Sequence, residues 1–215
     1  APPSDAAIAA MGPAEAVAAL RAHVAVARVA ERACERLTRD LVGGEQAAAE
    51  AGMIEAVAAA MRAHPQAVMV QVHGLCGLHS LCSGADAAGL ARARQAAEAG
   101  AIEAAVAAVR THQYVQVLGS LLLNAVCDGD DAAGRARKQR AAEAGAIEAV
   151  LEAMRALPQA ATVQEYGCKA LLTVCGGGAS AAARARRQRA AQAGGRTVVV
   201  GAMQAHPGDI DVQRE

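Results

Sequence analysis

Histidine and cysteine are the residue types in this sequence that could hold a metal ion or supply a nucleophile. Four of the six histidines recur about one sequence repeat apart, at the ends of apolar segments: His23, His64, His112 and His206. A metal site needs ligands that converge to bonding distance, which residues so far apart along a repeating chain do not provide. We interpret them as residues of the last helical turn, where an imidazole complements the carbonyl end of the helix dipole. No metal site is predicted.

The cysteines could in principle form disulfides, but their placement argues against it. No C-x-x-C pair occurs, and three cysteines stand at one repeat position at the end of an apolar segment. We expect all six to be reduced and to serve as small buried hydrophobic residues: Cys34, Cys76, Cys82, Cys127, Cys168 and Cys175. A reducing intracellular compartment follows, the cytoplasm by default, or an organelle interior if a targeting segment has been removed.

No set of residues in the sequence resembles a catalytic centre. Serine is sparse, the glycine-rich stretch GGGAS at 176–180 lacks the lysine of a phosphate-binding loop, and no pair of carboxylates stands in an apolar setting that would shift a pKa. We therefore predict that the protein is not an enzyme, with no catalytic residues and no cofactor.

The composition limits the remaining functions. The 215 residues are 54% hydrophobic but only 1% aromatic, so the core must consist of small aliphatic side chains, Met and Cys. The formal net charge is zero, which gives no global attraction to nucleic acid. No apolar run approaches the roughly 20 residues of a membrane-spanning helix. A soluble protein without a transmembrane segment is expected.

The elements that must position these residues are repeats. The glycine after AAEA or AAQA recurs at Gly52, Gly100, Gly145 and Gly194, at intervals of 48, 45 and 49 residues. A period in the forties built from apolar helical segments is typical of a solenoid. We predict one all-α domain over 1–215, with repeats at about 1–42, 43–84, 85–128, 129–177 and 178–215. The last is incomplete, and we expect the chain to be a segment of a longer array.

Each complete repeat shows a short, a medium and a longer helical segment. In the second repeat the breaks fall at Gly52, at His64-Pro65 and at Ser83-Gly84, where glycine and proline stop a helix. The first repeat is fainter: a lead-in over 1–12 precedes a helix over about 13–23 and an amphipathic helix over 26–41.

Three helices per repeat, with a glycine between the first two, resemble the armadillo repeat. The closest phrases are EAGAIEAVLEAM at 143–154 and VQEYGCKALLTVC at 163–175. HEAT repeats are the alternative, but they have two helices per repeat. The resemblance implies a right-handed α-solenoid whose third helices line a concave groove that binds an extended peptide or a partner helix.

The chain departs from the peptide-binding armadillo proteins at the positions that hold the partner. The tryptophan position reads Cys76, Leu121 and Lys169, and the asparagine position reads Ser80, Ala125 and Thr173. This disfavours a nuclear-import-receptor function. The candidate groove, which we call the third-helix column, is then apolar in two repeats and charged in one, and consists of Val72, Cys76, Ser80, Val117, Leu121, Ala125, Glu165, Lys169 and Thr173. It either receives a partner or is covered by a neighbouring segment.

Glycines recur inside the third helices, where each costs roughly 1 kcal/mol relative to alanine. Gly74, Gly119 and Gly167 share one repeat position. We expect another helix to cross so closely there that no side chain fits.

Basic residues also align, in the first helix of each repeat. We expect them to form a basic ridge on an outer edge that suits an anionic partner such as an acidic tail, lipid head groups or RNA. Ordinary solvated helix surface is the alternative, and nucleic acid is disfavoured because no aromatic residues interleave. The basic ridge consists of Arg92, Arg137, Lys138, Arg140, Arg186, Arg187 and Arg189.

Together these patterns predict a non-enzymatic scaffold that binds a partner protein through the groove. The alternative is a structural or linker subunit built permanently into a large multi-subunit assembly, including an organellar or membrane-associated one. The missing asparagines favour the alternative somewhat, because an array without a peptide clamp can still act as a rigid spacer.

Overall fold

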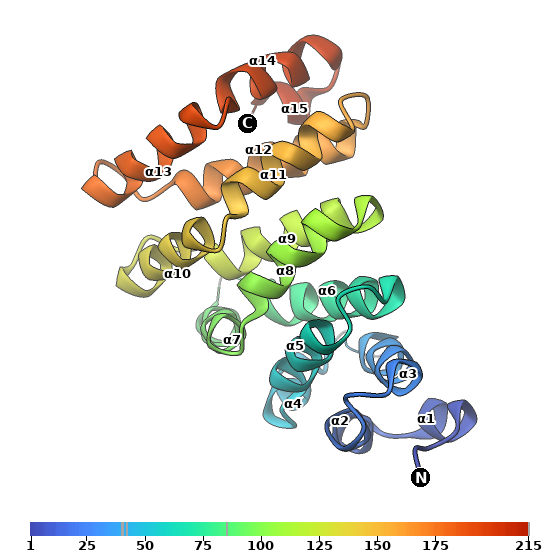
Figure 1. Cartoon of the computed structure of the whole chain (residues 1–215). Coiled ribbons are helices and arrows are strands. Elements are labelled where there is room, and N and C mark those ends of the chain that lie inside the picture. The colour runs from blue at the N-terminus through green and yellow to red at the C-terminus, as the bar shows by residue number, and fades with distance from the viewer. Residues whose placement is uncertain (40, 42, 85, 215) are drawn as a thin grey trace. The chain divides into compact units, whose positions relative to one another are not determined.

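The computed structural model describes residues 1–39, 41, 43–84 and 86–214 and is all-α (Figure 1). Over these residues it contains helices only, which confirms the predicted class. Every helix in this part of the chain is too short or too polar to cross a lipid bilayer.

The chain divides into two compact units, Ala1–Ala104 and Ala105–Glu215. The N-terminal unit contains α1 (Asp5–Ala10), α2 (Pro13–Ala22), α3 (Ala27–Arg39), α4 (Glu45–Glu50), α5 (Met53–Ala63), α6 (Val68–Cys82) and α7 (Ala87–Glu98). Helix α8 (Ala101–Thr111) includes the boundary between the units. The C-terminal unit continues with the short 3-10 helix η1 (Gln113–Val115), α9 (Gln116–Cys127), α10 (Ala132–Glu143), α11 (Ala146–Ala156), α12 (Ala161–Cys175), α13 (Ala181–Gln192), α14 (Gly195–Ala205) and α15 (Ile210–Arg214).

The predicted three-helix pattern is present. Helices α4 to α6 form the predicted short-medium-long set. In the fourth repeat the first helix is not short, since α10 has 12 residues and α11 has 11. The two helices predicted in the first repeat correspond to α2 and α3. The break at Gly52 is a left-handed turn with φ of 82°, and Gly145 and Gly194 repeat it with φ of 86° and 80°. Glycine adopts this conformation without a steric penalty.

One helix was not predicted. The lead-in contains α1, whose first turn is capped because the Ser4 hydroxyl accepts a hydrogen bond from the Ala7 amide. Arg28 and Arg32 of α3 both pair with Asp5, so α1 is attached to α3 by charge as well as by the buried Ile8.

The third-helix glycines lie at close helix crossings, as expected. A Cβ atom at Gly119 would stand 2.3 Å from a methyl group of Val109, and one at Gly74 or Gly167 would stand 2.6 Å from the Cγ of a methionine. These distances are shorter than real Cβ contacts allow, so the middle helix of each repeat occupies the space that a side chain would need.

Arginines near the ends of the middle helices connect successive repeats. We call Arg21, Arg62, Arg110 and Arg155 the latch arginines. Each donates a hydrogen bond to a backbone oxygen at the glycine turn of the next repeat: Arg21 and Arg110 to the Gly52 and Gly145 carbonyls at 3.1 Å, Arg62 to Ala99 at 2.5 Å, and Arg155 to Ala193. The last repeat has Gln204 at this position.

Glutamines of the third helices donate hydrogen bonds to carbonyls at the ends of the middle helices. The Nε2 of Gln164 donates to the Met154 and Leu157 carbonyls, both at 2.9 Å, and Gln71 and Gln213 repeat this pattern in their own repeats. These bonds satisfy carbonyls that a helix end leaves without an intrahelical partner. In the third repeat the loop between the middle and third helices is shorter and consists mainly of η1. There the buried Oε1 of Gln116 has no hydrogen-bond partner among the described residues.

Candidate partner-binding surface

The third-helix column forms one face of α6, α9 and α12, and its residues remain reachable from solvent. Ser80 is exposed and the other eight are partly exposed, whereas the neighbouring Gly74, Leu78, Gly119 and Val126 are buried. The periodicity therefore separated the solvent side of each helix from its core side correctly. Whether the column binds a partner stays a prediction.

In the C-terminal unit the column covers two helices that pack against each other, α9 and α12. The part on α9 consists of Val117, Leu121 and Ala125 and is apolar. Two further apolar or aromatic side chains are exposed, Leu172 of α12 at 59% exposure and Tyr114 of η1, directly before α9, at 79%. Both were missed by the sequence analysis. The signal was available, because Tyr114 is one of only two tyrosines in a chain without Phe or Trp.

The charged part of the column on α12 forms contacts within its own helix. The Nζ of Lys169 donates to a carboxylate oxygen of Glu165 at 2.6 Å and lies 5.1 Å from the centre of the Tyr166 ring. The pair is one helical turn apart, so α12 itself balances this charge. A partner at this position meets a neutral surface.

The column in the N-terminal unit lies beside a serine-histidine contact that is structural. The Ser83 hydroxyl lies 3.1 Å from the Nε2 of His79, but it also donates to the His79 carbonyl at 2.7 Å. Its only proton is therefore used in closing the end of α6. Burial lowers the pKa of His79 and raises the pKa of the Cys76 thiol, so both groups favour their neutral forms.

The basic ridge is the part of the sequence analysis that the structure corrects. Arg137, Lys138 and Arg186 are buried, contrary to the prediction of an outer edge. Their position follows from the preceding third helix, whose last carbonyls need donors. The Nε of Arg137 donates to the Val126 carbonyl at 2.5 Å and its Nη2 to the Asp128 carbonyl at 2.7 Å.

Arg186 and Arg92, which stand at the same repeat position as Arg137, also donate hydrogen bonds to the end of the preceding third helix. Arg186 donates through Nε to the Val174 carbonyl at 2.7 Å and through Nη2 to the Gly176 carbonyl at 2.6 Å. Arg92 is half-buried and donates to the Leu81 carbonyl. We call Arg92, Arg137 and Arg186 the cap arginines. Burial lowers the pKa of Arg186, as expected for a cation held among carbonyl dipoles.

The remaining ridge residues are also engaged. Lys138 pairs with Asp130 at 2.7 Å and lowers the pKa of that carboxyl group. The exposed Arg189 binds Glu148 with Nε at 2.6 Å, and the exposed Arg187 donates to the Gly178 carbonyl at 2.9 Å. Arg140 is half-buried. The ridge is therefore mainly an internal hydrogen-bond system, and Arg187 and Arg189 are its exposed members.

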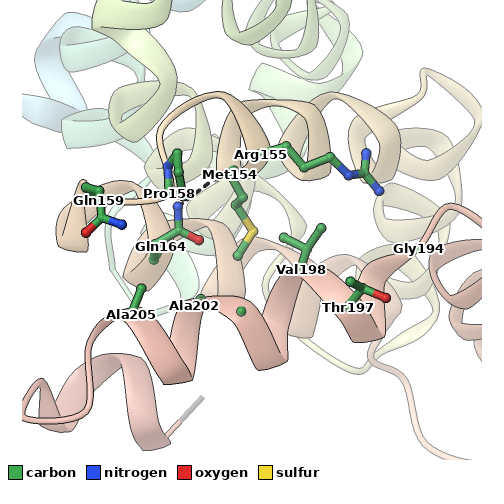
Figure 2. A pocket seen from close by; sticks show the side chains of 11 residues that line it. Met154, Arg155, Pro158, Gln159, Gln164, Gly194, Thr197, Val198, Ala202 and Ala205 are labelled. Atoms are coloured by element: carbon green, nitrogen blue, oxygen red, sulfur yellow. Dashed lines mark hydrogen bonds between the residues drawn. The ribbon is translucent and has the colours of Figure 1, made fainter.

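A cleft of about 590 Å³ lies between α11 and α14 (Figure 2). Figure 2 shows Met154 and Arg155 of α11 opposite Thr197 and Val198 of α14, with Gln164 beneath the loop at Pro158. The Nε2 of Gln164 and the guanidinium of Arg155 already donate to backbone carbonyls. The cleft thus offers mostly apolar surface. No cluster of three metal-ligating side chains occurs over the described ranges.

Comparison with known proteins gives no relative: no family model, no curated protein and no solved structure matches this chain. The resemblance to armadillo repeats therefore stays a prediction that rests on the phrases at 143–154 and 163–175.

Proposed function

We propose that this chain is a non-enzymatic scaffold of armadillo-like repeats that binds a partner protein through the third-helix column. The proposal includes a right-handed α-solenoid, for which the three-helix repeats and the glycine turns are the support. The observation that carries it is the apolar part of the column on α9, where Val117, Leu121 and Ala125 are reachable from solvent, because monomeric proteins rarely expose apolar patches without a use for them. All six cysteines are free thiols, which is consistent with a reducing compartment, but Cys76 and Cys175 are only partly buried, contrary to the prediction.

The experiment compares two aspartate variants as bait in affinity capture from the native source. Leu121→Asp places a charge in the column, whereas Leu90→Asp places it on the exposed side of a first helix, α7. We expect the same protein to be captured by the wild-type chain and by Leu90→Asp, and to be lost with Leu121→Asp. Circular dichroism establishes first that both variants are folded.

Retention of the captured protein by both variants would show that the column is not the binding surface. Raising the salt concentration adds a second criterion. Apolar contacts persist in high salt whereas exposed charge contacts are screened, so a partner held by the column should stay bound.

The second candidate function is a subunit built permanently into an assembly. The residues at the asparagine position favour it, namely Ser80, Ala125 and Thr173, because an array without a peptide clamp can still act as a rigid spacer. Capture of one fixed set of several proteins, together with aggregation of the isolated chain, would favour this alternative over a reversible scaffold.

A further inference from the structure

The cleft between α11 and α14, which we call the α11–α14 cleft, is bounded by these two middle helices and by Gln164 of α12. On α14 its wall contains Thr197 and Gly201, which are four residues apart and so lie on one side of the helix. The third helix of a repeat packs on a different side of the middle helix, at the position of Met154. The equivalent residue of α14 is Met203, which does not line the cleft. The α11–α14 cleft therefore lies outside the surface that a third helix covers.

Two residues of α14 depart from the repeat and explain why the cleft is open. Val198 stands where every earlier middle helix has a buried alanine, namely Ala16, Ala56, Ala104 and Ala149. The larger side chain holds α14 further from α11, and Val198 itself stays partly exposed. Gly201 then leaves the gap unfilled, since a Cβ atom there would meet nothing within 4 Å.

One end of the cleft carries positive charge. Figure 2 shows the Arg155 side chain extending toward Gly194, where α14 begins. The guanidinium donates one hydrogen bond to the Ala193 carbonyl, and its other N–H groups have no partner among the described residues. The positive end of the α14 dipole adds to this charge. This end of the cleft favours an anion.

None of the described residues that line the cleft is acidic, although the repeat normally places a carboxylate there. Every earlier middle helix has a glutamate three residues after its glycine, namely Glu15, Glu55, Glu103 and Glu148. In α14 this residue is Thr197, which Figure 2 shows beside Gly194. A carboxylate ligand is therefore not repelled at this end, and it meets a hydroxyl group as well as the guanidinium.

The opposite end of the cleft offers a hydrogen-bond acceptor. The Gln164 side chain is 1% exposed, and its Nε2 donates to two backbone carbonyls, which fixes the orientation of the amide. Its Oε1 has no partner in the part of the chain that the structure describes, and Figure 2 shows this oxygen on the side of Met154, toward the middle of the cleft. A polar atom in apolar surroundings is stabilised by a hydrogen bond. This end favours a ligand group that donates one.

We propose that the α11–α14 cleft binds a linear aliphatic carboxylic acid with a hydroxyl group at its far end. The carboxylate pairs with the Arg155 guanidinium, the chain packs on Val198 and Ala202, and the hydroxyl donates to the Oε1 of Gln164. The volume of about 590 Å³ is typical of small-molecule sites. Residues 194–205 extend over roughly 16 Å of helix, which suits a chain of about ten carbon atoms.

The test is isothermal titration calorimetry of the 215-residue protein with three ligands of equal chain length, each below its micelle concentration. The ligands are decanoate with a terminal hydroxyl group, plain decanoate, and decanol. We expect the hydroxy acid to bind at least about tenfold more tightly than decanol, which lacks the carboxylate, and about fivefold more tightly than decanoate, which lacks the donor for Gln164.

Two protein variants locate the site. Gly201→Leu fills the cleft and should weaken binding of all three ligands at least about tenfold. Thr197→Glu restores the glutamate of the repeat, so it should weaken both acids by repulsion and leave decanol unchanged. The matched control is Ala107→Leu, at the position of Gly201 on α8, which is exposed and should alter no affinity. Circular dichroism establishes first that all three variants are folded.

Three results would overturn the proposal. The first is failure of the hydroxy acid to saturate the wild-type protein. The second is equal binding by the wild type and by Gly201→Leu, which would place the ligand elsewhere on the apolar surface. The third is a decanol affinity equal to that of the acids, since the site would then not recognise a carboxylate. None of these results bears on the third-helix column, because no residue of the column lines the cleft or is substituted.

Discussion

The arginines of this protein bind mainly to backbone carbonyls. A guanidinium presents five N–H donors in a rigid plane, and the last turn of a helix presents carbonyls without partners together with a partial negative charge. Arg186 uses this match fully: Nε and Nη2 reach the end of α12, and Nη1 donates to the Gln139 side chain at 3.1 Å. Arg186, which the sequence pattern places on the surface, is therefore buried with only 3% of its surface exposed.

Replacing a cap arginine should destabilise the C-terminal unit far more than replacing a neighbouring arginine. Arg137→Ala removes two hydrogen bonds to charged nitrogens and leaves the Val126 and Asp128 carbonyls unsatisfied. We expect a loss of about 2–3 kcal/mol in the free energy of unfolding, measured by urea titration. Arg135→Ala, at an exposed site on the same helix, should change it by less than about 0.5 kcal/mol. Equal losses would contradict the capping function.

The Cys34 thiol should make the protein less stable at alkaline pH. Burial raises its pKa from the ordinary 9.0 to about 12. Between these values the unfolded chain has released the proton and the folded chain has kept it, so the free energy of unfolding falls by about 1.4 kcal/mol per pH unit from this group. Below pH 9 its contribution is constant.

Urea titrations from about pH 8 to pH 11, on the wild type and on Cys34→Ala, isolate this effect. The variant should be less stable than the wild type at pH 8 but should lose stability less steeply above pH 9. Parallel curves would show that Cys34 ionises normally.

At the scale of helices, the third-helix glycines set how closely the middle and third helices approach. At each of these glycines, the space that a side chain would occupy is filled by a side chain of the middle helix, Met61, Val109 or Met154. The periodicity of the sequence was sufficient to predict this, because a glycine costs helix stability and its recurrence requires a compensating contact. The glutamine caps were not predicted, although Gln71 and Gln164 also share one repeat position, because a glutamine is equally common on a solvated helix.

Two glycine-to-alanine changes should have opposite signs. Gly119→Ala forces a Cβ into the methyl group of Val109, and we expect a loss of about 1–3 kcal/mol. Gly201→Ala, inside α14, meets nothing within 4 Å and should gain up to about 1 kcal/mol from helix propensity. Thermal and urea unfolding give both values. A stabilised Gly119→Ala would show that the crossing can relax, and Gly119→Ala combined with Val109→Ala should recover part of the loss.

At the scale of the molecule, the sequence was a good guide to repetition and a poor guide to which polar groups the repetition buries. The helical class, the glycine turns and the solvent side of the third helices follow from spacing alone. The position of Arg137 does not, because spacing shows which residues align but not how far a long side chain reaches. Helix α1 was missed because its stability comes from Asp5 and the distant Arg28 rather than from a local pattern. The binding of a partner stays a prediction.

The latch arginines should determine how independently the last repeat opens. Arg155→Ala removes the bond to the Ala193 carbonyl, so we expect amide hydrogen exchange in α13 and α14 to accelerate about tenfold, as for the loss of one charged hydrogen bond. Exchange in α2 to α6 should not change. Gln204→Ala, at the same repeat position in the last repeat, is the matched control and should leave both rates as they are. Acceleration throughout the chain would instead indicate a single cooperative unit.

Because each latch ends on a backbone oxygen, the contact depends on the glycine turn and not on the identity of the side chains around it. Gly52 and Gly145, which both follow AAEA, accept an arginine at the same 3.1 Å, and Arg155 makes the corresponding contact with the Ala193 carbonyl although that turn lies in a different sequence, AAQAGGRTV. A duplicated or exchanged repeat would carry a working arginine at one end and a working acceptor at the other. The sequence of the surfaces between successive latch contacts can therefore change without loss of these contacts. A change in the number of repeats then becomes an accessible evolutionary step.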